Sequence, residues 1–401
     1  MASRAQSFED LATWGDSVPH VILMDNLSEE EEDMVDPTYI DPRPTIPEVE
    51  MIDRTMAELE AELESLRLKK AHLLAMRALI GGIPPEILSR IFELGVHECN
   101  HLLPVISLVS RHWRDVALAT ASLWSYIRLD HDWGYARHPA FLRKLNTCIQ
   151  RSQACKLAID LDCRYLEATS ELHQIMTTLE PHLDRCFSFH ISISVPDRDW
   201  MSIVQEHTAL LGPSLEHLFI RLESEDQTPF TFLSQPCPCL FSIVLENTQL
   251  TCIRTALPAL RSLQLIRDER YHSFSRISIS FRELLDLLST TPMLTDLRVK
   301  SALFLLDGTE PIFHPCPVFA TFPELKSLTF DNVDSNNVAL FLESSLLPAL
   351  TRLSVCMDPQ SEESMQWLMR LSLDSPRRFP VLRHLDLRSC NIDGAALLPF
   401  V

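Results

Sequence analysis

The sequence predicts an α/β protein in which an N-terminal helical part precedes an irregular, horseshoe-shaped solenoid of strand–helix repeats. Between residues 48 and 127, apolar residues recur every three or four positions, which is typical of helices. From about residue 150, a proline-led motif with alternating apolar residues recurs seven times, which is typical of repeated short strands. We therefore expect an acidic tail over 1–47, an amphipathic helix over 48–80, a helical module over 81–130 and a repeat domain over 131–401.

The composition excludes several classes of function. The 401 residues carry a formal net charge of −20, which argues against nucleic acid or a membrane surface as partner, because phosphates require Lys and Arg. Of eight glycines only Gly81 and Gly82 lie close together, so no glycine-rich phosphate loop can form. The G-x-S-x-G elbow of serine hydrolases is also absent. We expect no catalytic residue, no cofactor and no metal.

Targeting signals are not evident in the sequence. The N-terminus has no basic flank before an apolar stretch, and no run of about 18 apolar residues occurs. We therefore expect neither a signal peptide nor a membrane helix, and a cytoplasmic and/or nuclear location. The eleven cysteines are scattered, so we expect reduced and mostly buried thiols.

The first eighty residues change character near residue 48. The first fifty hold thirteen acidic residues and two arginines, and this like charge together with several prolines predicts disorder over 1–47. In the helix predicted over 48–80, Lys70 and Arg77 interrupt the apolar series. A coiled coil with a second copy is one interpretation, but these basic positions and the few heptads favour a helix that packs on its own domain. The apolar series comprises Ile52, Met56, Leu59, Leu63, Leu66, Leu73 and Ile80.

Residues 83–127 predict short helices. Pro84 and Pro85 open the first helix, while Gly95 and Pro104 mark its end and the start of the next. A helical module of about 45 residues cannot bury its apolar residues alone, so a partner surface is expected. The apolar positions are Ile83, Ile87, Leu88, Ile91 and Phe92, then Leu108, Val109, Trp113, Val116 and Ala117, with Leu123-Trp124 at the end of the module.

The repeated unit reads Pro-x-Leu-x-x-apolar-x-apolar, and its spacing of 20 to 34 residues is close to that of leucine-rich repeats. The last copy continues to Cys390 and Ile392, which completes the leucine-rich-repeat signature. Weaker copies occur at Leu157-Ile159-Leu161 and Phe187-Phe189-Ile191. Helices are expected between strands, at Phe281–Leu288, Val338–Leu342 and Met365–Leu371. The leading leucines are Leu215, Leu240, Leu260, Leu294, Leu325, Leu350 and Leu382.

A target-binding surface is expected on the strand positions that face away from the core, because successive side chains of a strand alternate between two faces. These positions would line the concave side of the solenoid. They are His217, Phe219, Arg221, Gln264, Asp296, Arg298, Lys300, Asp331, Arg352, His384, Asp386 and Arg388.

Three stretches, Ile83–Phe92, Leu108–Ala117 and Leu123-Trp124, together resemble an F-box. The preceding helix is similar to one found before the F-box in fungal members of that family, and Ser110 stands where the family commonly has cysteine. The resemblance implies a non-catalytic adaptor for ubiquitin-dependent degradation. By this resemblance the F-box would bind a Skp1-type protein, and through it cullin and RING subunits, while the leucine-rich repeats would capture an unknown target protein. The docking residues carried over are Ile83, Pro84, Ile87, Leu88, Ile91, Phe92, Val109 and Trp113.

Two alternatives stay open at this point. One is a leucine-rich-repeat interaction protein that works outside any ligase. The other is a zinc hydrolase, since His97-Glu98-Cys99-Asn100-His101 matches H-E-x-x-H, in which two histidines of one helix bind zinc. This segment lies between Gly95 and Pro104, a poor place for a continued helix.

Overall fold

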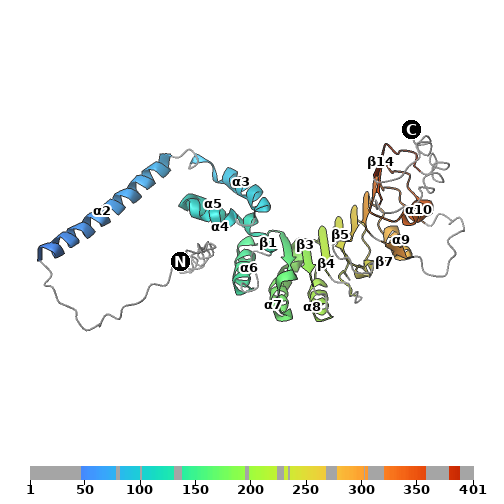
Figure 1. Cartoon of the computed structure of the whole chain (residues 1–401), viewed down its shortest axis with the longest axis horizontal. Helices are drawn as coiled ribbons and strands as arrows, with labels where there is room; N and C mark the ends of the chain where they lie inside the picture. The colour runs from blue at the N-terminus through green and yellow to red at the C-terminus, as the bar shows by residue number, and fades with distance from the viewer. Residues whose placement is uncertain are drawn as a thin grey trace, which may run out of the picture. The chain divides into compact units, whose positions relative to one another are not determined.

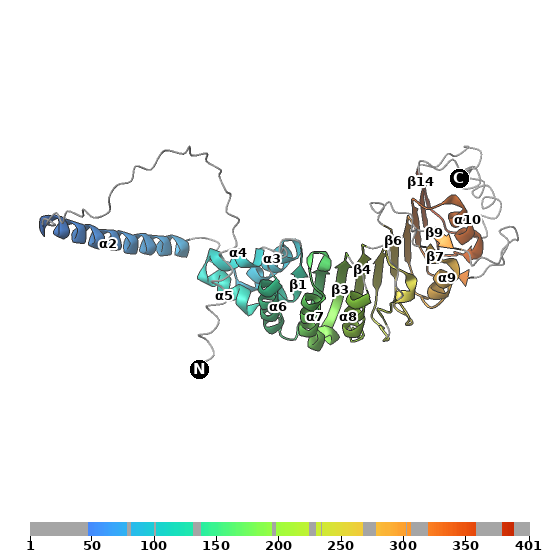
Figure 2. The same ribbon diagram turned by 60° about the horizontal axis from the view of Figure 1, so that its bottom comes forward.

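The chain divides into two compact units, the first ending at Ala119 and the second beginning at Thr120. Each is described by itself (Figures 1 and 2). The acidic tail and the helix expected at Met365–Leu371 lie outside the described residues. The computed structural model describes residues 47–77, 82–99, 102–130, 138–194, 198–223, 230–233, 235–267, 278–301, 303–305, 320–357 and 379–388.

The first unit is helical. The predicted amphipathic helix is present as α2 (Pro47–Arg77), and the short helices that follow are α3 (Pro85–Glu98), α4 (Leu102–Val109) and α5 (Arg111–Ala119). Every α2 side chain that the structure describes is exposed, so the expected packing of this helix on its own domain is not found there. Because Lys70 interrupts the apolar row, the helix has no continuous apolar face suited to a domain core.

The second unit is built on a parallel sheet of ten strands that follow one another in chain order. All seven strands predicted from the proline-led motif are present, and the two weaker copies form β2 and β3. The strands are β1 (Tyr126–Leu129), β2 (Leu157–Asp162), β3 (Cys186–Ile193), β4 (His217–Leu222), β5 (Ser242–Glu246), β6 (Ser262–Ile266), β8 (Asp296–Lys300), β11 (Ser327–Asp331), β13 (Arg352–Cys356) and β14 (His384–Arg388).

In each of its seven copies the proline-led motif forms the turn that starts the strand. In the first copy, the Leu215 amide donates to the Gly212 carbonyl at 3.2 Å, which places Pro213 second in a four-residue turn, where its fixed φ is favourable. The turns also form hydrogen bonds with the neighbouring repeat, since the Phe241 amide donates to the Glu216 carbonyl of the preceding copy at 2.7 Å. Each repeat is therefore held to its neighbour before the strand itself begins.

The strand alternation creates the core. On β4, Leu218 and Ile220 are buried while Phe219 between them is partly exposed. Strand pairing aligns these positions with Ile243 and Leu245 of β5, so two rows of apolar side chains run across the sheet. Burial of a Leu or Ile side chain stabilises the fold by about 1.5–3 kcal/mol, so these rows are the main source of stability.

Helices α6, α7 and α8 lie on one side of strands β1–β4 (Figures 1 and 2). The helices expected at Phe281–Leu288 and Val338–Leu342 are present within α9 and α10. One helix per repeat was expected, but the described parts of the β4–β5 and β5–β6 connections contain no α-helix, only η7 (Leu250–Cys252) in the second, because this 20-residue copy is too short. The α-helices are α6 (His138–Ser152), α7 (Thr169–Leu179), α8 (Arg198–Thr208), α9 (Phe281–Ser289) and α10 (Ser335–Ser344).

Short elements complete the second unit. Two small parallel sheets pair β7 with β9 and β10 with β12. Leu123 and Trp124, expected at the end of the helical module, are buried in this unit, where the Arg151 guanidinium lies 4.4 Å from the Trp124 ring. The remaining elements are η2 (Ala121–Trp124), η5 (Cys163–Tyr165), η6 (Glu180–Arg185), β7 (Ser278–Ser280), β9 (Leu303–Leu305), β10 (Ala320–Thr321) and β12 (Ser345–Leu346).

Candidate functional site

Helix α3 carries apolar side chains on two faces. Leu88 and Phe92 are 1% and 2% exposed and belong to the core of the chain. Ile87, Ile91 and Leu94 follow one another at helical spacing and are all exposed, the first two at 54% and 50%. A surface row of large apolar side chains is typical of a protein-binding site.

Helix α4 repeats this arrangement on a smaller scale. Leu103 and Ile106 are buried, whereas Val105, Leu108 and Val109 are exposed, Leu108 at 75%. Together with the exposed row of α3, these residues form what we call the helical apolar surface. Its members are Ile87, Ile91, Leu94, Val105, Leu108 and Val109.

Local contacts fix the three helices of this module. The rings of Phe92 and Trp113 lie 5.0 Å apart and join α3 to α5. The Ser110 hydroxyl accepts a hydrogen bond from the Trp113 amide at 3.1 Å, which caps the start of α5. The Arg114 guanidinium donates to the Ser107 carbonyl at 2.8 Å, near the end of α4. The apolar surface therefore sits on helices whose ends are held by specific bonds.

The structure separates the eight predicted docking residues into three groups. Pro84, Ile87, Ile91 and Val109 are exposed, while Ile83 and Trp113 are partly exposed. Leu88 and Phe92 are buried and pack inside the chain, whereas the sequence predicted that they lie on the docking face. Three exposed apolar residues were missed, although their helical spacing from predicted members could have revealed them: Leu94, Val105 and Leu108.

These exposed rows lie in the part of the chain that a family comparison identifies. Residues 80–130 match the F-box-like family model. F-box domains generally bind Skp1-type partners and are typically non-catalytic adaptors. No curated protein matches the chain. The F-box-like segment covers the helical apolar surface and continues through η2 and β1 into the second unit.

The second candidate surface is the polar face of the main sheet. Strand pairing places Asp160, His190 and Phe219 side by side on β2, β3 and β4. The same row continues through Gln264 on β6 and Arg298 on β8. None of these positions belongs to the two buried apolar rows, so the whole row faces away from the core.

Charged side chains at the ends of β2–β5 form a network on this face. Arg164 pairs with Asp162 at 2.6 Å and with Glu223 at 2.7 Å. Arg221 contacts the same Glu223 at 3.0 Å and Glu246 of the next strand at 3.5 Å. Because these groups are only partly exposed, their mutual pairing orients them more firmly than isolated surface pairs would.

All twelve predicted target-binding residues lie on this face, since each occupies an outward position of β4, β6, β8, β11, β13 or β14. Sequence reasoning missed the outward residues of β1–β3, which lack the proline-led motif, and those of β5, although β5 follows the second copy of that motif. The alternation in Leu157-Ile159-Leu161 could have revealed Asp160 and Asp162. The missed residues are Arg128, Asp160, Asp162, His190 and Glu246.

Burial shifts the titration of two neighbours on this face. Loss of solvent raises the pKa of Asp160, although His190 and Arg128 nearby oppose the shift. Loss of solvent lowers the pKa of His190, and the carboxylate of Asp160 only partly offsets this. The His190 ring also lies 5.3 Å from that of Phe219.

Acidification from about pH 7 toward pH 5 is expected to destabilise the second unit in part through His190. The unfolded chain takes up this proton near the ordinary value of 6.5, whereas the folded sheet takes it up only at lower pH. The stability due to neutral His190 is therefore present above this value and is lost as the pH falls below it. In urea unfolding at several pH values, His190→Gln should show a weaker pH dependence than wild type. An unchanged dependence would contradict the expectation.

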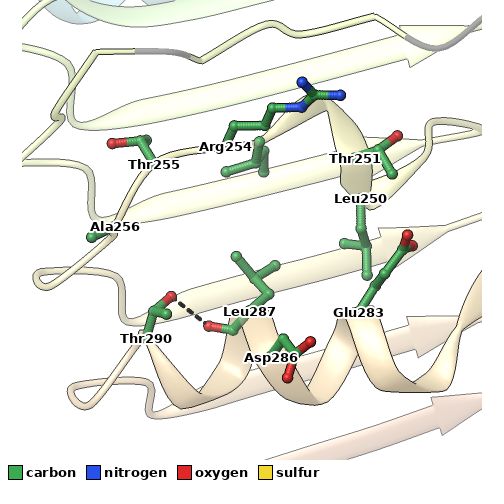
Figure 3. A pocket seen from close by; sticks show the side chains of 10 residues that line it. Leu250, Thr251, Arg254, Thr255, Ala256, Glu283, Asp286, Leu287 and Thr290 are labelled. Carbon is green, nitrogen blue, oxygen red and sulfur yellow. Dashed lines mark hydrogen bonds between the residues drawn. The ribbon is translucent and has the colours of Figure 1, made fainter.

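A hollow of about 450 Å³ lies between η7 and α9 (Figure 3). Arg254 lines one side of the hollow, and Glu283 and Asp286 of α9 line the other. The Thr290 hydroxyl is already bonded to the Leu287 carbonyl at 2.7 Å. The hollow is open, and no set of polar groups converges in it, so it does not resemble an enzyme site.

The zinc-hydrolase alternative needs a helix through His101. Helix α3 ends at Glu98, and Cys99 has extended backbone angles, as expected from the flanking Gly95 and Pro104. Asn100 and His101 lie outside the described residues. Within the described ranges, no cluster of His, Cys, Asp or Glu has metal-binding geometry.

The cysteines that the structure describes are unpaired. Five of these nine thiols are buried: Cys148, Cys163, Cys186, Cys237 and Cys252. Burial raises the pKa of Cys148 to about 11, which keeps it protonated and unreactive near neutral pH. Among the helices that the structure describes, none combines the length and apolar character needed to cross a bilayer.

Proposed function

We propose that this chain is the substrate-recognition adaptor of a Skp1–cullin–F-box ubiquitin ligase. The carrying observation is that a segment matching the F-box-like model exposes six large apolar side chains from two adjacent helices. Docking to a Skp1-type protein would bury them, which accounts for their exposure in the isolated chain. The ubiquitin-transfer chemistry then belongs to the cullin-bound subunits, and this chain contributes no catalytic residue.

In this proposal the second unit is the target receptor, a leucine-rich-repeat solenoid whose polar sheet face captures the target protein. Support comes from the recurring Pro-x-Leu turn, the backbone hydrogen bonds between neighbouring repeats and the row of aromatic and charged residues on the outward face. Aromatic residues and arginine supply much of the binding energy of protein interfaces. The organisation is therefore a tail over 1–47, a helix over 48–80, an F-box over 81–130 and repeats over 131–401.

Affinity purification of the full chain tests both parts of the proposal, the docking to a Skp1-type protein and the capture of a target. Wild type should recover a Skp1-type protein and a target, and reversing Arg298→Glu with Lys300→Glu should lower target recovery by about tenfold or more while the Skp1-type protein stays. The matched control reverses two exposed arginines outside the polar face, Arg254→Glu with Arg282→Glu, and should change neither. Target capture without any Skp1-type protein would instead favour the ligase-independent interaction protein.

A further inference from the structure

Helix α2 holds a row of apolar side chains that nothing in the described chain covers. The row follows alternating steps of three and four residues, so it forms a narrow seam along one side of the helix. Its apolar members between Ile52 and Leu73 are all about half exposed. At 1.5 Å per residue the 31-residue helix is about 47 Å long, which is sufficient for four heptads. The seam comprises Ile52, Met56, Leu59, Leu63, Leu66, Lys70 and Leu73.

The charges of α2 are divided between its halves. Residues 47–64 hold seven acidic side chains and one arginine, whereas residues 65–77 hold four basic side chains and no acidic one. Such a helix matches a second copy of itself when the two run in opposite directions, because each acidic half then lies against a basic half. A parallel pair would instead place acid against acid and would stack Lys70 on Lys70 of the second copy.

We propose that α2 forms an antiparallel two-stranded coiled coil with α2 of a second copy of this chain. The central layers pair Leu63 with Leu66 of the second copy, and the next layers pair Leu59 with Lys70. Lys70 can lay its aliphatic stem along Leu59 and keep its ammonium group in water. Lys70, which argued against a coiled coil in the sequence analysis of this helix, therefore disfavours only a parallel coiled coil.

The residues that flank the seam fit the same register. With Leu63 against Leu66, Glu60 lies opposite Arg67 of the second copy, and Glu62 lies opposite Lys69. Two-fold symmetry repeats both pairs, so four complementary contacts border the apolar layers. Within its own helix Arg67 contacts the exposed Glu64 at 3.6 Å, a weak pair that it can exchange for Glu60 of the second copy.

The mass of the full chain in solution is the first test. Sedimentation equilibrium at micromolar concentration should give twice the 45.8 kDa of one chain. Leu63→Asp with Leu66→Asp should give the single mass, because two charges then enter each central layer. The matched control, Ala61→Asp with Leu68→Asp, changes exposed residues off the seam and should keep the double mass. A single mass for wild type, or a double mass for the seam variant, would overturn the proposal.

Charge reversal tests the register without touching the apolar layers. Glu60→Lys with Glu62→Lys should lower the mass to that of one chain, and so should Arg67→Glu with Lys69→Glu. Mixing the two variants should restore the double mass, because each then supplies the charge that the other lacks. If the mixture stays monomeric, Glu60 and Glu62 do not face Arg67 and Lys69.

A photo-reactive residue at position 56 tests whether the two α2 helices run antiparallel or parallel. After trypsin digestion, an antiparallel pair should give a cross-link to the peptide that contains Leu73. A cross-link between two copies of the peptide that contains position 56 would show a parallel pair and overturn the proposal.

Discussion

Replacing Ile87 and Ile91 with aspartate in the full chain should abolish co-purification with a Skp1-type protein. Both side chains are about half exposed on α3, so the substitutions place charge on the proposed interface without entering the core. Interface anchors of this kind are worth about 2 kcal/mol or more each, so the pair should weaken binding about a thousandfold. Binding is measured by titration against the purified Skp1-type protein.

The control for this variant changes exposed apolar residues of the other unit. Leu210→Asp with Met293→Asp introduces the same charges at similarly exposed positions and should leave binding unchanged. Thermal unfolding of both variants should match wild type, because none of the four side chains is buried. If Ile87→Asp with Ile91→Asp bound as tightly as wild type, the helical apolar surface would not be the docking site. Phe92→Asp is no substitute, since it would bury a charge beside Trp113 and unfold the module.

Phe341→Ala should cause the largest loss of stability of the variants considered for the second unit. Phe341 is fully buried on α10, and its ring lies 5.6 Å from that of Phe330 on the sheet and 6.1 Å from that of Phe322. Removal of a buried Phe ring costs about 3–5 kcal/mol through lost burial and the cavity that remains. Urea unfolding of the full chain, followed by a signal from the second unit, measures this loss.

Phe241→Ala is the matched control, because Phe241 is 42% exposed. The His217 ring lies 5.9 Å and the Arg261 guanidinium 5.5 Å from the centre of the Phe241 ring. The same truncation there should cost less than about 1 kcal/mol. A loss of similar size in both variants would mean that the cluster around Phe341 adds little beyond surface packing.

The strands could be predicted from the sequence because each repeat contains local residue patterns that determine its turn and its strand. Proline fixes the turn, leucine fills the core beneath it, and alternation sets the two faces, as at Pro213, Leu215 and Leu218. Helices between strands were harder, because the length of a connection limits what it can hold. The short connection after β5 forms only η7, whereas one helix per repeat was expected.

The candidate site was less predictable than the fold. Helical spacing places Ile87 and Leu88 on neighbouring positions of α3, but it does not say which of two apolar faces packs inward. That choice depends on tertiary contacts such as Phe92 with Trp113, which a single sequence does not display. On the sheet, alternation with a period of two leaves no such ambiguity, so all twelve predicted residues lie on the outward face, although the outward residues of β5 were not named.

The position of β1 limits where this protein can be divided. Strand β1 lies at the end of the F-box-like segment, yet it pairs with β2 as the first strand of the main sheet. A fragment of the second unit cut at residue 131 would lack β1 and would leave the amides and carbonyls of β2 unpaired along one edge. Open strand borders recruit strands from other chains and promote aggregation. The last residues of the F-box-like segment thus cover the edge of β2, and a fragment that keeps this edge covered must begin at or before Thr120, where the second unit starts.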